Sequence, residues 1–189
     1  CAYTMQRIDD EGSHVEHLKP QCRCAAGEDV DYGNLLACHP GPQAGSDYGA
    51  RHKGGWWPDD TASMDVHFVS PLHPHCKQRF RFDLNGNMQP RLPDDDAAAR
   101  TIEILGLQNR ALIELRRSRV RAALKNHRRE ELSLGEAQRK LAELDSRDAD
   151  GRLPPFLAAV RQALQGHVER MERARMAKRL AARARRRDP

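Results

Sequence analysis

The sequence predicts an α+β protein, in which short strands come first and helices follow. Phe80, Phe82 and Leu84 alternate with charged side chains and lead into Asn85-Gly86, a pair typical of a tight β-hairpin. In the second half of the chain, apolar residues recur at helical spacing among charged ones. These two patterns place a hairpin near the middle of the chain and a helical part after it.

The strand elements of the first half are short. A strand ends near Glu16 and His17, because Pro20 follows and a proline donates no hydrogen bond to a sheet. After an irregular polar stretch, residues 31–38 lead back toward Glu16 and His17. Residues 50–57 predict the start of a helix, which two consecutive glycines keep short.

Each helix of the second half has a recognisable start. Acids at positions 94–96 favour a helix N-terminus, and Gly106 ends that helix. Asn109 caps the next helix, and residues 133–136 form a capping box for a third. A last helix begins after Pro154. We therefore expect three parts: a core with the hairpin over 1–92, a helical extension packed on it over 93–168, and a basic C-terminal helix or tail over 169–189.

The first part carries the residues with candidate chemistry. Glu16 offers a hard oxygen ligand suited to Mg²⁺ or Mn²⁺, and His17 offers a base that works near neutral pH. The amide of Asn34 can hold loop carbonyls, so that His17 keeps one orientation. His52 would complete the metal site from a third segment, and Lys53 is available to a phosphate. Such a set is what a single-metal phosphodiesterase requires.

At these residues the chain resembles the HNH, or ββα-metal, endonucleases. Further segments resemble the HNH proteins that accompany an ATPase in Septu-type and retron-linked anti-phage systems, and the similarity extends to about residue 165. The matching segments are residues 15–20 (VEHLKP), 34–38 (NLLAC), 52–54 (HKG), 68–72 (FVSPL), 80–86 (FRFDLNG) and 101–107 (TIEILGL).

The resemblance implies a small ββα-metal core and a role for each polar residue. Glu16 and His52 would be metal ligands, His17 the general base and Asn34 the residue that orients this base. It also implies a structural zinc site, for which Cys1 and Cys38 would supply two of the four ligands. The other two positions hold Thr4 and a residue close to Tyr48, so half of the zinc set is missing.

Composition bears on the partners and the compartment. A net charge of +5 and a pI near 9.1 suit a polyanion such as DNA or RNA, and no apolar run is long enough to span a membrane. Five cysteines, an odd number, favour reduced thiols and hence the cytoplasm. Because the sequence opens with Cys1, we expect a preceding segment. A basic tail is the predicted phosphate-binding element, and it includes Arg183, Arg185, Arg186 and Arg187.

Two hypotheses follow. The first is a metal-dependent nuclease that cuts DNA or RNA, acting in anti-phage defence with an ATPase partner. The second is a degenerate HNH scaffold that binds nucleic acid or a partner protein without catalysis, and it is motivated by Thr4 and Tyr48. Metal-stimulated cleavage by the purified protein separates the two hypotheses.

Overall fold

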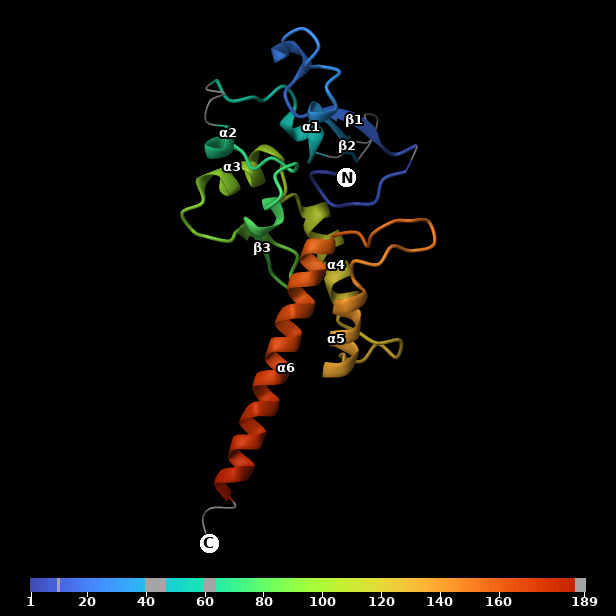
Figure 1. Ribbon diagram of the computed structural model, residues 1–189, viewed down its shortest axis with the longest axis vertical. Helices are drawn as coiled ribbons and strands as arrows, with labels where there is room; N and C mark the ends of the chain where they lie inside the picture. The colour runs from blue at the N-terminus through green and yellow to red at the C-terminus, as the bar shows by residue number, and fades with distance from the viewer. Residues whose placement is uncertain (10, 40–46, 60–63, 186–189) are drawn as a thin grey trace. The chain divides into compact units, whose positions relative to one another are not determined.

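The computed structural model describes residues 1–9, 11–39, 47–59 and 64–185. The chain divides into two compact units, 1–118 and 119–189. Helices and small antiparallel sheets occur together, which confirms the α+β class (Figure 1). Among the described helices, none is both long enough and apolar enough to cross a membrane.

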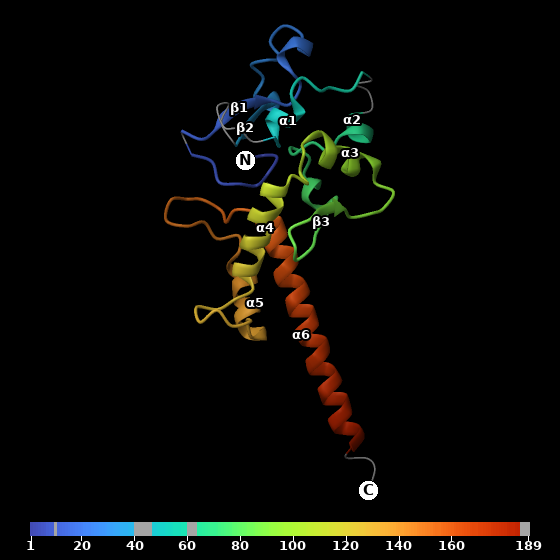
Figure 2. The same cartoon turned by 180° about the vertical axis from the view of Figure 1, so that it is seen from behind.

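The first unit begins with a two-stranded sheet. Strand β1 (His14–His17) pairs antiparallel with β2 (Leu35–Cys38), and Glu16 lies opposite Leu36. Helix α1 (Ala50–Lys53) lies close to this sheet in both views (Figures 1 and 2). This arrangement brings the end of β1 and the last residue of α1 together.

The predicted hairpin is confirmed. Strand β3 (Phe80–Phe82) pairs antiparallel with β4 (Met88–Pro90). The turn is longer than a two-residue Asn-Gly turn, because the carboxylate of Asp83 accepts hydrogen bonds from backbone N–H groups at 85 and 87. Gly86 takes the left-handed conformation (φ +87°) that ends such a loop.

Three further helices belong wholly or mainly to the first unit: α2 (Met64–His67), α3 (Asp96–Ile104) and α4 (Arg110–Ala123), the last of which runs across the division between the units. Asp95 caps α3 by accepting a hydrogen bond from Ala98 N–H, as the acids at 94–96 predict. Buried apolar side chains from β2, β3, β4, α3 and α4 form the core of this unit.

The core of the first unit includes one buried cation. The side chain of Arg116, on α4, is 1% exposed, and its guanidinium lies 5.9 Å from the centre of the Phe82 ring. Its Nη2 donates to the carbonyl of Leu107. Burial lowers the pKa of Arg116 to about 10, and the nearby Asp83 opposes this shift. This arginine therefore faces the core and is unavailable to a phosphate.

The second unit is a helical pair. Helix α5 (Leu134–Glu143) opens with the predicted capping box of Ser133 and Glu136, and it packs beside α6 (Leu157–Arg185). Their shared core is formed by Leu132, Ala137, Leu144, Val160 and Leu164.

The buried imidazole of His167 contacts the backbone of Leu132, a residue of this second core. It is 2% exposed, Nε2 lies 2.8 Å from the carbonyl of Leu132, and Nδ1 lies 2.9 Å from Nη2 of Arg170. Since a carbonyl only accepts and a guanidinium only donates, Nε2 carries the proton and Nδ1 accepts. His167 is therefore a satisfied structural histidine.

Candidate active site

Glu16 and Lys53 form a partly buried ion pair at the centre of the candidate site. Nζ of Lys53 lies 2.9 Å from Oε1 of Glu16 and donates a second hydrogen bond, 3.0 Å long, to the carbonyl of His17. The Lys53 side chain is 1% exposed and that of Glu16 is 16% exposed. The sequence suggested Lys53 as a phosphate contact, but the structure turns its amine inward, onto the end of β1.

The ring of His17 is fixed by one backbone contact. Nε2 lies 2.9 Å from the carbonyl of Asp29, in the loop between β1 and β2. A carbonyl oxygen only accepts, so Nε2 carries a hydrogen, and in the neutral ring Nδ1 is the nitrogen with the lone pair. This tautomer leaves one nitrogen able to take a proton from water.

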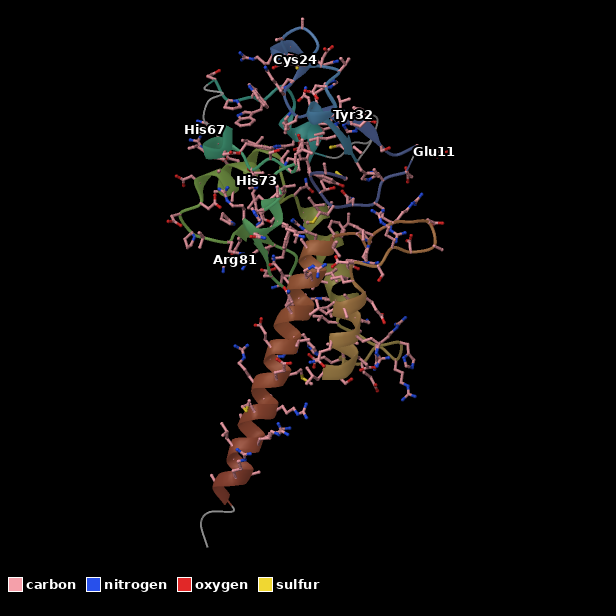
Figure 3. All side chains as sticks on the ribbon, viewed as in Figure 1. Glu11, Cys24, Tyr32, His67, His73 and Arg81 are labelled. Carbon is pink, nitrogen blue, oxygen red and sulfur yellow. The ribbon has the colours of Figure 1, made fainter. Side chains whose placement is uncertain are left out.

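Asn34 holds the same loop, as the sequence predicts. Its Oδ1 accepts from Lys19 N–H at 2.7 Å, and its Nδ2 donates to the carbonyls of Lys19 and Glu28, both at 3.1 Å. Nδ2 also lies 3.5 Å from the thiol sulfur of Cys24, which is labelled in Figure 3. The side chain is 9% exposed. One amide therefore fixes both ends of the loop that carries the carbonyl bound by His17.

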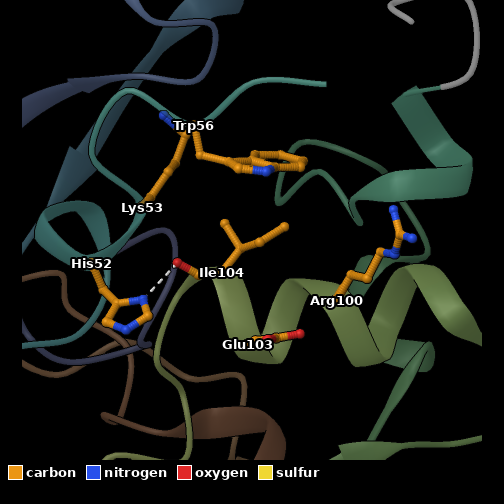
Figure 4. Close-up of a pocket in the computed structure, with 6 residues that line it drawn as sticks. All are labelled: His52, Lys53, Trp56, Arg100, Glu103 and Ile104. Atoms are coloured by element: carbon orange, nitrogen blue, oxygen red, sulfur yellow. Dashed lines mark hydrogen bonds between the residues drawn. The ribbon is translucent and has the colours of Figure 1, made fainter. Parts of the chain in front are cut away.

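His52 is directed away from this cluster. Its Nδ1 lies 2.9 Å from the carbonyl of Ile104, and the residue is exposed (Figure 4). It borders an open hollow of about 460 Å³, in which the indole of Trp56 lies above the Ile104 side chain in the close-up. The residues lining the hollow are His52, Lys53, Trp56, Arg100, Glu103 and Ile104.

Helical geometry explains why Lys53 and not His52 meets Glu16. Consecutive residues of an α-helix point about 100° apart around its axis, so adjacent side chains cannot both face β1. α1 is one turn long and ends at Gly54 (φ +52°), which leaves no later position to face the strand.

The structure brings one of the two predicted metal ligands to the end of β1. Glu16 is the ligand that lies there, and its carboxylate already holds an ammonium group. Across the described ranges, no three His, Cys, Asp or Glu side chains are grouped so as to hold an ion. The structure thus brings together the Glu16 carboxylate, the Lys53 ammonium and the backbone carbonyl of His17, whereas the His17 ring contacts the Asp29 carbonyl and His52 lies outside.

The cysteines expected at a zinc site meet at the other end of the β1–β2 sheet. Ala2 N–H donates to the carbonyl of Ala37 at 2.9 Å, so the first turn lies against the end of β2. The sulfur of Cys1 accepts from Thr4 N–H at 3.4 Å, and Cys38 is fully buried. These two thiols fall short of the four ligands that structural zinc takes.

Buried groups near this sheet experience the charge of Glu16. Burial raises the pKa of Cys38 to about 11, and the negative charge of Glu16 adds to the rise. The pKa of Tyr3 is raised strongly by the same two causes, in the same order. The Cys38 thiol therefore stays protonated near neutral pH.

Two of the predicted phosphate-binding residues, Arg183 and Arg185, lie on the C-terminal part of α6. We call residues 172–184 the cationic arm, because all of its side chains are exposed and it carries five basic residues and one acidic residue. Figure 3 shows side chains with blue nitrogen atoms projecting outward along this part of α6. Arg183 is in the arm, Arg185 is the last residue of α6, and Arg186 and Arg187 lie outside the described residues.

Sequence reasoning missed two features of the site. The adjacency of His52 and Lys53 indicates that only one of them can face the strand, but it does not indicate that Lys53 is the one that contacts Glu16. The carbonyl of Asp29 gives no signal in the sequence, because every residue has a carbonyl and only the loop conformation selects this one. Comparison with models of known families gives no match, and no curated protein matches the chain.

Proposed function

We propose that the protein is an HNH-type nuclease that hydrolyses phosphodiester bonds in DNA or RNA, with His17 as the general base. The observation that carries this proposal is the hydrogen bond from Nε2 of His17 to the carbonyl of Asp29, which in the neutral imidazole makes Nδ1 the nitrogen that bears the lone pair. Activating water requires a base in this protonation state, held in one orientation.

The surrounding groups support this role. Asn34 holds the backbone at Lys19 and Glu28, on either side of the irregular loop, so the Asp29 carbonyl keeps its place beside Nε2 of His17. In the proposed step Nδ1 of His17 takes a proton from a water molecule, whose oxygen attacks the phosphorus as the leaving oxygen departs.

The test is cleavage of plasmid DNA and of a long RNA in the presence of Mg²⁺ or Mn²⁺. His17→Ala should lower the rate by about 10²- to 10⁴-fold, the usual contribution of a general base. His127→Ala is the control, because that histidine is exposed. Equal nicking by His17→Ala and the parent protein, with both folded, would refute the role.

A second candidate is a scaffold that binds nucleic acid without cutting it. Two observations favour it: the Glu16 carboxylate is already neutralised by Lys53, and the cationic arm exposes its charge along one helix. Tight, salt-sensitive binding with no cleavage under Mg²⁺ or Mn²⁺ would favour this candidate. For either function, we propose an ATPase partner in anti-phage defence, on the resemblance alone.

A further inference from the structure

The Lys53 ammonium occupies an environment made of oxygen atoms. It contacts Oε1 of Glu16 at 2.9 Å and the carbonyl oxygen of His17 at 3.0 Å, and only 1% of its side chain is exposed. A charge removed from water in this way requires an opposite charge or hydrogen bonds to replace its hydration. Glu16 supplies the charge and the strand carbonyl supplies a second acceptor.

A carboxylate oxygen and a backbone carbonyl oxygen are also ligands that hard divalent cations accept. The Lys53 ammonium therefore contacts the same two oxygen atoms that a divalent ion bound at Glu16 would contact. Lys53 also lines the open hollow of about 460 Å³ beside His52, and this hollow is the alternative position for the ammonium at the end of its four-carbon side chain.

We propose that the Lys53 ammonium is the built-in cation of the Glu16 site, and that a divalent ion binds Glu16 only by displacing it. The proposal rests on the proposed function only in taking Glu16 as the cation ligand. It follows that the parent protein binds divalent ions weakly, and that removing the ammonium strengthens the binding.

The experiment measures Mn²⁺ binding from the electron paramagnetic resonance signal of the free ion. Lys53→Met keeps the length of the side chain and removes its charge, and the Mn²⁺ dissociation constant should fall at least tenfold. Adding Glu16→Gln to this variant should abolish the gain. Lys19→Met is the matched control, because it removes a different Lys–Glu pair, with Glu28, and should leave Mn²⁺ binding unchanged.

Each outcome decides the matter. Unchanged Mn²⁺ affinity in Lys53→Met, or a gain that survives Glu16→Gln, overturns the proposal. If Lys53→Met is unfolded without divalent ions, a cooperative unfolding transition restored by Mn²⁺ supports the proposal, and failure to restore it overturns it.

The nuclease proposal is judged separately, by cleavage. If Lys53→Met binds Mn²⁺ more tightly than the parent but neither protein cuts nucleic acid, the built-in-cation proposal stands and the nuclease proposal is refuted. If the parent cuts nucleic acid but Lys53→Met binds Mn²⁺ with unchanged affinity, the nuclease proposal stands and the built-in-cation proposal is overturned.

Discussion

Replacing Asn34 by Ala tests whether one buried amide supports the candidate base. The substitution removes the Oδ1 atom that accepts a hydrogen bond from Lys19 N–H. It also removes the Nδ2 group that donates to the carbonyls of Lys19 and Glu28. All three partners are backbone groups of the loop between β1 and β2. The loss should therefore loosen the loop while leaving the strands paired.

The magnitude follows from those three bonds. A typical hydrogen bond contributes about 0.5–1.5 kcal/mol net, so the three bonds together give an upper value of about 4.5 kcal/mol. Lys19 and Glu28 are 24% and 45% exposed in their side chains, so water reaches this part of the loop and replaces part of the loss. We expect the free energy of unfolding of the first unit to fall by about 2 kcal/mol.

Tryptophan fluorescence during urea denaturation is the appropriate assay. The chain has two tryptophans, Trp56 and Trp57, and both belong to the first unit, so the signal is local to the unit that is changed. Gln89→Ala, an exposed amide of the same unit, should change stability by less than about 0.5 kcal/mol. A loss for Asn34→Ala no larger than that of Gln89→Ala would refute the reasoning.

Three other results are expected. Gly86→Ala should destabilise the first unit by at least about 2 kcal/mol in the same assay, because its φ is +87° and a Cβ would lie 2.3 Å from the carbonyl oxygen of Ile113; an unchanged transition would contradict this. Changing the five basic residues of the cationic arm to Gln should reduce the slope of log affinity against log salt by up to about 4 for a fluorescent DNA duplex, and an unchanged slope would exclude the arm as the phosphate contact. The hydrogen bond from Arg79 lowers the pKa of Asp95, so the stability that it contributes is present above the pKa of an unfolded carboxyl, about 4, and is lost as the pH falls below it. Asp95→Asn should flatten this loss in acid unfolding curves and the exposed Asp94→Asn should not; equal flattening by both would count against the pair.

Local signals in the sequence predicted the elements that depend on local chemistry. The capping box at Ser133 and the acids before α3 act within a single turn, so they hold wherever the helix packs. The hairpin also followed from its own residues. Its turn did not, because Asp83 binds two later backbone N–H groups and draws an additional residue into the loop. Side-chain competition for backbone donors is not visible in an Asn-Gly pair alone.

The division into two units depends on packing between distant segments. The boundary falls within α4, and the buried Arg116 belongs to the first unit, where its guanidinium lies over the Phe82 ring of the hairpin. A run of arginines in a sequence does not show which member is buried. The Phe82 ring and the Leu107 carbonyl determine this, and both depend on the tertiary structure.

At the candidate site, the sequence predicted the loop contacts of Asn34, but it did not predict which residue of α1 contacts Glu16. Asn34 could be assigned because an amide with two donors and an acceptor suits a loop that needs both, wherever the loop lies. His52 and Lys53 differ by one position, and one position rotates a side chain by about 100°. The contact with Glu16 therefore depends on where a one-turn helix begins, which Gly49, at φ +70°, and the neighbouring loop determine.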